Sequence, residues 1–127
     1  AAPADFRPTQ RVNVKIKKGR AGTKIDLEQT EDILRTTIPK RKKKSLVVGF
    51  ALETGDGVRN AREKLKSKDL DMVVLNDATE PGAGFGVDTN RVTLIDRAGT
   101  EEELQLMSKI DLAEVLLDRI EEKLNGR

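Results

Sequence analysis

The stretch SLVVGFAL, residues 45–52, decides the fold class of this 127-residue chain. Its unbroken apolar run is bounded by turn signals, which is typical of a strand buried on both faces of a parallel sheet. A helix with apolar residues at helical spacing is expected over residues 57–65, and a second apolar run, DMVVL, occupies residues 71–75. Strand, helix and strand at this spacing predict a βαβ unit.

Shorter elements are predicted before this unit. Residues 1–8 resemble the end of a strand that runs into a loop, and residues 12–18 alternate as a half-exposed strand or an extended flap. A strand over residues 24–29 is followed by a short helix, for which Thr30 is the expected N-cap. The run Lys40 to Lys44 forms a basic connection to the βαβ unit.

A hairpin and a long helix are predicted after the βαβ unit. Residues 90–96 alternate as a strand, and residues 103–107 are the expected hairpin partner. Ser108 and Asp111 form a capping box for a helix that runs to about Leu124. The predicted core-facing stripe of this helix is Ile110, Ala113, Leu117, Ile120 and Leu124. The whole pattern predicts a three-layer, Rossmann-like α/β fold, with a mostly parallel sheet, helices on both faces and a C-terminal β-hairpin extension.

Composition excludes several classes of protein. Charged residues make up 36 % of the chain, but the net charge is only +2, which argues against a disordered polyelectrolyte and against a dedicated nucleic-acid binder. Without His or Cys, the chain has no Ser-His nucleophilic pair and no His- or Cys-ligated zinc. Absence of Cys favours the cytoplasm, and neither a membrane span nor a signal peptide is visible.

Two features suggest where a ligand binds. In open α/β sheets, ligands bind at the carboxyl ends of the strands, where the loop after Ala4, the stretch after Phe50 and Asn76-Asp77 are expected to converge. Lys64 and Lys68 are four residues apart on the predicted helix, so they share a face from which two ammonium groups can hold a polyphosphate. The alternatives are solvated strand ends for the first feature and lysines snorkelling at a helix edge for the second.

Other clusters carry weaker signals. The basic residues among Lys15 to Lys18 are followed by glycines, so this stretch is either a lid that closes over a nucleotide or an ordinary solvated face. The glycines at 82, 84 and 86 do not form a phosphate loop, because their spacing is wrong and a strand follows where a helix is needed. The run Lys40 to Lys44 fits a solvated loop better than a nucleic-acid patch, because no aromatic residue is near it.

Several motifs together resemble the bacterial phosphopantothenoylcysteine synthetase family. This ligase is usually the C-terminal half of the bifunctional coenzyme A biosynthesis flavoprotein, also called the DNA/pantothenate metabolism flavoprotein. The most specific strings are GFALET at residues 49–54 and GAGFGVDTNRV at residues 82–92. Weaker matches are ADFRP at 4–8, KIKK at 15–18, DIL at 32–34, residues 61–71 and Asn76-Asp77.

The resemblance implies a CTP-dependent ligation of cysteine to 4'-phosphopantothenate in coenzyme A biosynthesis. The phosphopantothenate carboxylate attacks the α-phosphate of CTP with help from Mg²⁺, pyrophosphate leaves, and the cysteine amine displaces CMP from the acyl-cytidylate. The resemblance also implies a homodimer or larger homo-oligomer, with FMN present only if a decarboxylase half is fused upstream. No nucleic-acid or membrane partner is expected.

The resemblance also assigns site residues, motif by motif. Lys15 is the expected catalytic residue, on a flap that closes over the acyl-cytidylate. Nucleotide contacts are expected from Asp5, Lys15, Thr30, Glu31, Asp32, Ile33, Phe50, Lys64 and Lys68, with the last two binding phosphate. No metal-ligating residue is assigned.

Departures from the family pattern leave alternatives open. Pro3 stands where Val is common and Glu31 where Pro is common, and the family's glycine-rich first segment is absent. Residues 1–127 are therefore expected to be the C-terminal portion of a single synthetase domain, inactive on its own. The alternatives are a non-catalytic assembly module of the same fold and, less favoured, a nucleic-acid-binding module.

Overall fold

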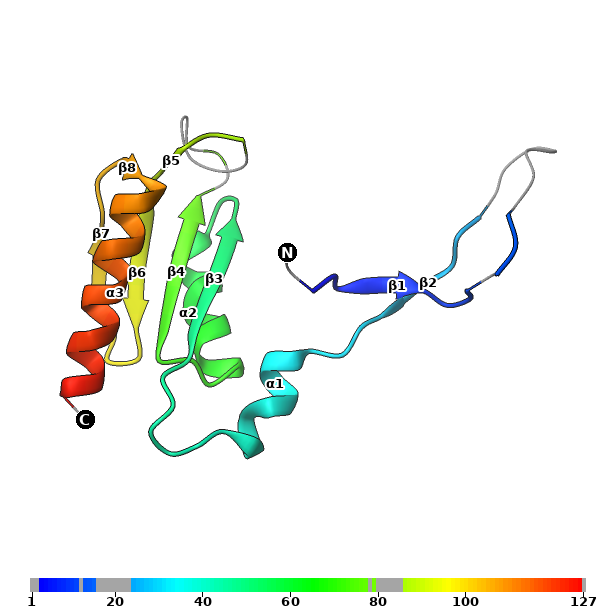
Figure 1. Ribbon diagram of the computed structural model, residues 1–127, viewed down its shortest axis with the longest axis horizontal. Helices are drawn as coiled ribbons and strands as arrows, with labels where there is room; N and C mark the ends of the chain where they lie inside the picture. The colour runs from blue at the N-terminus through cyan, green and yellow to red at the C-terminus, as the bar shows by residue number, and fades with distance from the viewer. Residues whose placement is uncertain (1–2, 12, 16–23, 78, 80–85, 127) are drawn as a thin grey trace. The chain divides into compact units, whose positions relative to one another are not determined.

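The computed structural model describes residues 3–11, 13–15, 24–77, 79 and 86–126, and it divides into two compact units. The first unit comprises Ala1–Thr37 and the second Ile38–Arg127 (Figure 1). Each unit is described by itself below. None of the helices within the described ranges is long and apolar enough to cross a membrane.

The first unit contains a two-stranded antiparallel sheet and one short helix. Strand β1 (Phe6–Pro8) pairs with β2 (Leu27–Gln29), and α1 spans Ile33–Thr37. The prediction that the chain leaves a strand before Asp5 and continues as a loop is wrong, because Phe6 to Pro8 pair with β2. The predicted strand before Thr30 is confirmed in its last three residues.

The second unit is built on a four-stranded sheet. Its spatial order is β3-β4-β6-β7, with β3–β4 parallel and the other two pairs antiparallel. A short sheet pairs β5 with β8, and two helices complete the unit. The bounds are η1 Ile38–Lys40, β3 Val48–Glu53, α2 Gly57–Ser67, β4 Met72–Asp77, β5 Thr89–Asn90, β6 Val92–Asp96, β7 Glu101–Glu103, β8 Met107–Ser108 and α3 Lys109–Asn125.

The sheet is mixed, so the predicted mostly parallel sheet is wrong for the described strands. The βαβ unit β3-α2-β4 is confirmed, because α2 carries the chain back to start a parallel strand. Strand β6 instead runs antiparallel to β4, and β7 follows through a tight turn in which Gly99 has a φ of 95°. Antiparallel neighbours do not need a helical crossover. The predicted hairpin is present, but the partner of β6 is Glu101–Glu103 rather than residues 103–107, and the hairpin continues the main sheet rather than extending from it.

The two long helices pack on opposite faces of the sheet (Figure 1). Successive side chains of a strand point to opposite faces. Met72 and Val74 of β4 contribute to a cluster with α3. Leu75 instead lies near Gly57 of α2, where an added Cβ would be 3.4 Å from the leucine methyl groups.

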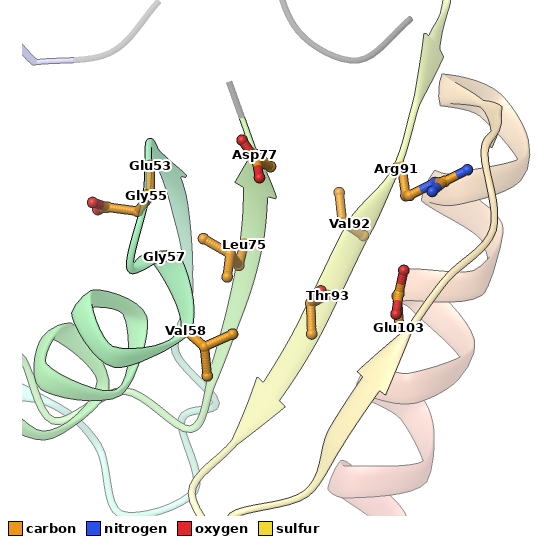
Figure 2. A pocket seen from close by; sticks show the side chains of 10 residues that line it. All are labelled: Glu53, Gly55, Gly57, Val58, Leu75, Asp77, Arg91, Val92, Thr93 and Glu103. Carbon is orange, nitrogen blue, oxygen red and sulfur yellow. The ribbon is translucent and has the colours of Figure 1, made fainter. Parts of the chain in front are cut away.

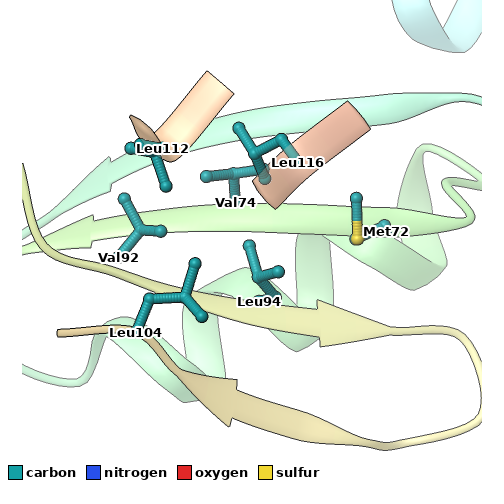
Figure 3. Packing of buried hydrophobic residues seen from close by; sticks show 7 residues of the cluster. All are labelled: Met72, Val74, Val92, Leu94, Leu104, Leu112 and Leu116. Atoms are coloured by element: carbon teal, nitrogen blue, oxygen red, sulfur yellow. The ribbon is translucent and has the colours of Figure 1, made fainter. Parts of the chain in front are cut away.

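The aliphatic core on the α3 face joins two strands, β4 and β6, the segment after β7 and the helix (Figure 3). Its buried members are Met72, Val74, Val92, Leu94, Leu104, Leu112 and Leu116. Leu116 is 9 % exposed and Met72 only 1 %. Burial of these side chains removes apolar surface from water and is the main favourable contribution to folding of this unit.

The core-facing stripe predicted for α3 is wrong except at Ile120, which packs against the core. Ile110, Leu117 and Leu124 are 74 %, 64 % and 47 % exposed, whereas Leu112 and Leu116 are buried. The helix carries apolar residues on two adjoining faces, so periodicity alone does not identify the buried one. Packing against the strands selects it, and two ion pairs join this face of α3 to the sheet, Arg119 with Glu102 and Lys123 with Asp96, both at 2.7 Å.

Strand β3 is buried on one face only, which corrects the prediction of burial on both. Gly49 and Ala51 are buried, whereas Phe50 is 73 % exposed and Leu52 44 %. Among the described strands, β3 pairs only with β4, so it is an edge strand. Gly49 is needed for a close approach, because a Cβ there would lie 2.6 Å from Cδ1 of Leu70.

Substitution of two neighbouring leucines tests which face of α3 is buried. We expect Leu116→Ala to lower the free energy of unfolding by about 2–5 kcal/mol, because it leaves a cavity in the core. Leu117→Ala, the matched control, should change it by less than about 1 kcal/mol because Leu117 is exposed. Urea denaturation followed by circular dichroism measures both, and a larger loss for Leu117→Ala would contradict this packing.

The Arg119–Glu102 ion pair predicts a pH-dependent stability. The Arg119 guanidinium hydrogen bonds to the Glu102 carboxylate and lowers its pKa below the ordinary value. A carboxyl with a lowered folded-state pKa stabilises the fold above its unfolded pKa, about 4.3 for Glu, and loses that contribution as pH falls through the folded pKa. Glu102→Gln should therefore lower the urea midpoint at pH 7, and its difference from wild type should disappear in acid.

Glu103→Gln is the control for this measurement. Glu103 is the next residue, and it forms no ion pair with any residue in the described ranges. The urea midpoint of Glu103→Gln should differ from that of the wild type by the same small amount at every pH. If the urea midpoint of Glu102→Gln also differs from that of the wild type by an amount that does not depend on pH, the ion pair does not stabilise the packing of α3 on the sheet.

Candidate functional site

Parallel pairing brings the ends of β3 and β4 to one edge of the sheet. Glu53 and Asp77, the last residues of the two strands, are register partners. Gly55, with a φ of 77°, then turns the chain into α2, which begins at Gly57. The predicted convergence of the stretch after Phe50 with Asn76-Asp77 is therefore confirmed. The loop after Ala4 belongs to the other unit, and its convergence stays a prediction.

Glu53 is the centre of a polar network between β3 and α2. Lys64 Nζ lies 2.5 Å from Glu53 Oε1, and Asn60 Nδ2 donates to Oε2 at 3.0 Å. The Glu53 side chain is only 14 % exposed, whereas that of Lys64 is 40 % exposed. The hydrogen bonds from Lys64 and then Asn60 lower the pKa of Glu53 despite its partial burial. Glu53 is therefore ionised at neutral pH and fixed in orientation.

A pocket of about 290 Å³ lies beside this network on the α2 face of the sheet (Figure 2). Leu75 and Val58 supply apolar walls, and the polar groups include Glu53 and Asp77 at the ends of β3 and β4. At its edge, the hydroxyl and backbone N–H of Thr79 bind the Asp77 carboxylate and lower its pKa. The full lining is Glu53, Gly55, Gly57, Val58, Leu75, Asp77, Arg91, Val92, Thr93 and Glu103.

Lys64 and Lys68 lie on one face of α2, as predicted. Both are half-buried and flank Leu65, which is 8 % exposed. Lys68 is the C-cap of the helix, and its N–H donates to the carbonyl of Lys64 at 3.0 Å. The Lys64 ammonium is directed toward the carboxyl end of β3 by its contact with Glu53.

Phe50 lies on the opposite face of β3 from Glu53. The register pairs Phe50 with Val74, which faces α3, whereas Glu53 is on the face of α2. The structure thus does not bring Phe50 together with Lys64 on one face. A ligand that contacts both must cross the outer edge of β3, where no described strand pairs.

The remaining predicted contacts belong to the first unit, where the β1–β2 pairing brings Asp5 and Thr30 together. Thr30 N donates to the Asp5 carbonyl at 2.9 Å, and the Thr30 hydroxyl donates to the Ala4 carbonyl. Thr30 is therefore not the predicted N-cap. Asp32 caps α1, because its carboxylate accepts the N–H of Arg35 at 3.1 Å. Glu31 and Ile33 are exposed beside it.

Lys15 is exposed and lies outside any helix or strand. The rest of the predicted flap, residues 16–23, and most of the glycine-rich segment, residues 80–85, lie outside the described residues. Lys15 and the two lysines of α2 belong to different units, so their meeting at one site stays a prediction.

Glu53 and Asn60 were not among the site residues predicted from the sequence, although two features of the sequence pointed to them. Asn60 and Lys64 are four residues apart, which places them on the same face of α2. Glu53 ends a buried strand inside the GFALET string, where an acid is expected to find a partner. Neither signal identifies the contact without the packing of α2 on β3.

Comparisons with known proteins agree on one family. The family model "DNA/pantothenate metabolism flavoprotein C-terminal domain" matches residues 1–124. The chain is 44 % identical over 120 residues to the "Coenzyme A biosynthesis bifunctional protein CoaBC" of Bacillus subtilis (strain 168), covering 94 % of this chain and 29 % of the relative. It is 46 % identical over 120 residues to a "Cysteine/Cysteine sulfinic acid decarboxylase" from an unknown prokaryotic organism, covering 94 % of this chain and 33 % of the relative.

A solved structure supports the same assignment. The crystal structure of the C-terminal domain of a coenzyme A biosynthesis bifunctional protein CoaBC matches with a TM-score of 0.75 and 33 % identity, covering 100 % of this chain and 53 % of that one. The chain thus spans about a third of the curated relatives and about half of the solved domain. By the family model and by these relatives, the chain belongs to the DNA/pantothenate metabolism flavoprotein C-terminal domain family.

Proposed function

We propose that this chain is part of a phosphopantothenate–cysteine ligase that makes phosphopantothenoylcysteine for coenzyme A in the cytoplasm. Membership of the family and the likeness to the Bacillus subtilis relative support the pathway and the reaction class. The observation that carries the proposal is the position of Lys64, which presents an accessible ammonium group near the carboxyl end of a parallel strand. Ligands of open α/β sheets bind at this edge.

The proposed reaction needs charge neutralisation and a closed site rather than a nucleophilic side chain. The phosphopantothenate carboxylate attacks the α-phosphate of CTP and expels pyrophosphate, and the cysteine amine then attacks the acyl-cytidylate and expels CMP. Lys64 and Lys68 bind the phosphates, and their positive charge stabilises the charge that develops during transfer. Lys15 closes over the acyl-cytidylate and excludes water.

The nucleotide is proposed to lie across the outer edge of β3. Phe50 and Lys64 are on opposite sides of this strand, so a nucleotide at the edge reaches the phenyl ring on one side and the ammonium on the other. Phe50 is 73 % exposed and offers a flat apolar surface for stacking of the base or ribose. Asp5, Thr30, Glu31, Asp32 and Ile33 complete the nucleotide contacts from the first unit.

Magnesium is proposed to arrive with the triphosphate. The described residues contain no group of three or more His, Cys, Asp or Glu side chains that holds a metal ion by itself. Mg²⁺ commonly binds through substrate phosphates with only one or two carboxylates. Such an ion would be carried by the nucleotide and would supply positive charge to its phosphates. FMN enters only where a decarboxylase half is fused upstream.

The complete ligase requires more than this chain. Its relatives are about three times as long, and residues 1–127 are proposed as the C-terminal portion of one synthetase domain. The proposed active form is a homodimer or larger homo-oligomer, and its partners are small-molecule substrates rather than nucleic acid or membrane.

A calorimetric titration of the chain with CTP and magnesium tests the nucleotide site. We expect saturable binding that is tighter for CTP than for ATP. If the chain binds neither nucleotide, the same titration is made on the full-length parent protein, together with an assay for CTP-dependent pyrophosphate release. A parent that neither binds CTP nor releases pyrophosphate would contradict the ligase and favour the assembly module of the same fold.

Three alanine variants of α2 then test the phosphate lysines. Lys64→Ala and Lys68→Ala should each weaken CTP binding by roughly tenfold or more, because each loses a charge-assisted hydrogen bond to phosphate. Lys66→Ala is the matched control, because this lysine is exposed on the same helix but on another face. Equal affinities for all three variants and the wild type would exclude Lys64 and Lys68 from the site.

A further inference from the structure

We propose that Glu53 is a positioning residue that holds the Lys64 ammonium in the orientation from which it binds nucleotide phosphate. This inference rests on the proposed function of Lys64 and adds a residue to that site. Glu53 itself does not contact the nucleotide, because it acts through Lys64. Its carboxylate lies at the end of β3, inside the GFALET string.

The geometry around Glu53 is that of a fixed support. Each carboxylate oxygen has its own partner on α2, with Lys64 Nζ on Oε1 and Asn60 Nδ2 on Oε2. Two hydrogen bonds from one helix prevent the carboxylate from rotating. An ammonium group has three N–H donors, so Lys64 keeps two donors for a ligand after its contact with Glu53.

The difference in exposure separates the roles of the two side chains. Glu53 is 14 % exposed, and both of its carboxylate oxygens are already hydrogen bonded, whereas Lys64 is 40 % exposed and accessible. A largely buried acid that fixes an accessible cation reduces the conformational entropy that the flexible lysine loses on binding. Protein kinases use a Lys–Glu ion pair in this way to hold a phosphate-binding lysine.

Two physical effects of Glu53 oppose each other. As a support it strengthens phosphate binding, because it orients the Lys64 ammonium. As an anion it weakens phosphate binding through Coulomb repulsion. A substitution that removes the charge of Glu53 without changing its shape therefore weakens phosphate binding if orientation dominates and strengthens it if repulsion dominates. Both Glu53 oxygens are engaged by side chains of α2, so we expect orientation to dominate.

The test compares Glu53→Gln with Glu63→Gln in the calorimetric titration with magnesium and CTP. We expect Glu53→Gln to weaken CTP binding by about tenfold, the effect of losing one oriented charge-assisted contact. Glu63 is the matched control, because it immediately precedes Lys64, is exposed, and forms no ion pair with the residues that the structure describes. Glu63→Gln makes the same change of charge and should not weaken binding.

A double-mutant cycle with Lys64→Met separates positioning from a general structural effect. If Glu53 acts through Lys64, Glu53→Gln causes no further loss of affinity in the Lys64→Met background. Nitrogen-15 NMR of the Lys64 side chain provides a readout that does not need nucleotide. We expect a resolved Nζ signal in the wild type that is lost in Glu53→Gln and retained in Glu63→Gln.

The outcomes distinguish this inference from the proposed function. Wild-type binding of CTP together with equal or tighter binding by Glu53→Gln overturns the positioning role and leaves the nucleotide site intact. Loss of affinity in Glu53→Gln that persists unchanged in the Lys64→Met background also overturns it. Absence of CTP binding to both the chain and its full-length parent overturns the proposed function and the positioning role together.

Discussion

The parallel pairing of β3 with β4 is the contact on which the candidate site depends. It places the ends of both strands at one edge and makes Glu53 and Asp77 neighbours. The same pairing requires α2 to run back along the sheet, and this return brings Lys64 within reach of Glu53. A shift of one residue in the register would turn every side chain of β3 to the opposite face. Both the polar network around Glu53 and the packing of the core therefore depend on the register between β3 and β4.

The two faces of the sheet differ in the side chains they present. The α3 face holds the aliphatic core from Met72 to Leu116, and salt bridges from Arg119 and Lys123 fasten the helix above it. The α2 face has its polar groups and a pocket at the strand ends. Strand β3 leaves the apolar side chains of Phe50 and Leu52 exposed at the sheet's edge. Because of this asymmetry, one face forms the core while the side chains of the candidate site stay accessible on the other face and at the edge.

The reaction proposed for this family member needs no nucleophilic side chain. A chain that lacks Cys and His is compatible with the proposed CTP-dependent ligation, because in that reaction the substrates supply both nucleophiles and the protein supplies positive charge. In that setting, both the charge of a lysine and its orientation contribute. The Lys64–Glu53 pair holds the end of a flexible side chain against a largely buried carboxylate.

Local patterns in the sequence were enough to determine the βαβ unit, the shared face of Lys64 and Lys68, and the capping of α3 by Ser108, because these depend on residues close in the chain. Only the tertiary structure decided the mixed sheet, the exposed face of β3 and the buried face of α3. Leu116 and Leu117 are both apolar residues of one helix, and only packing against distant strands buries the first and exposes the second. The Glu53–Lys64 contact has the same origin, since two residues eleven positions apart meet only when a helix folds back onto its own strand.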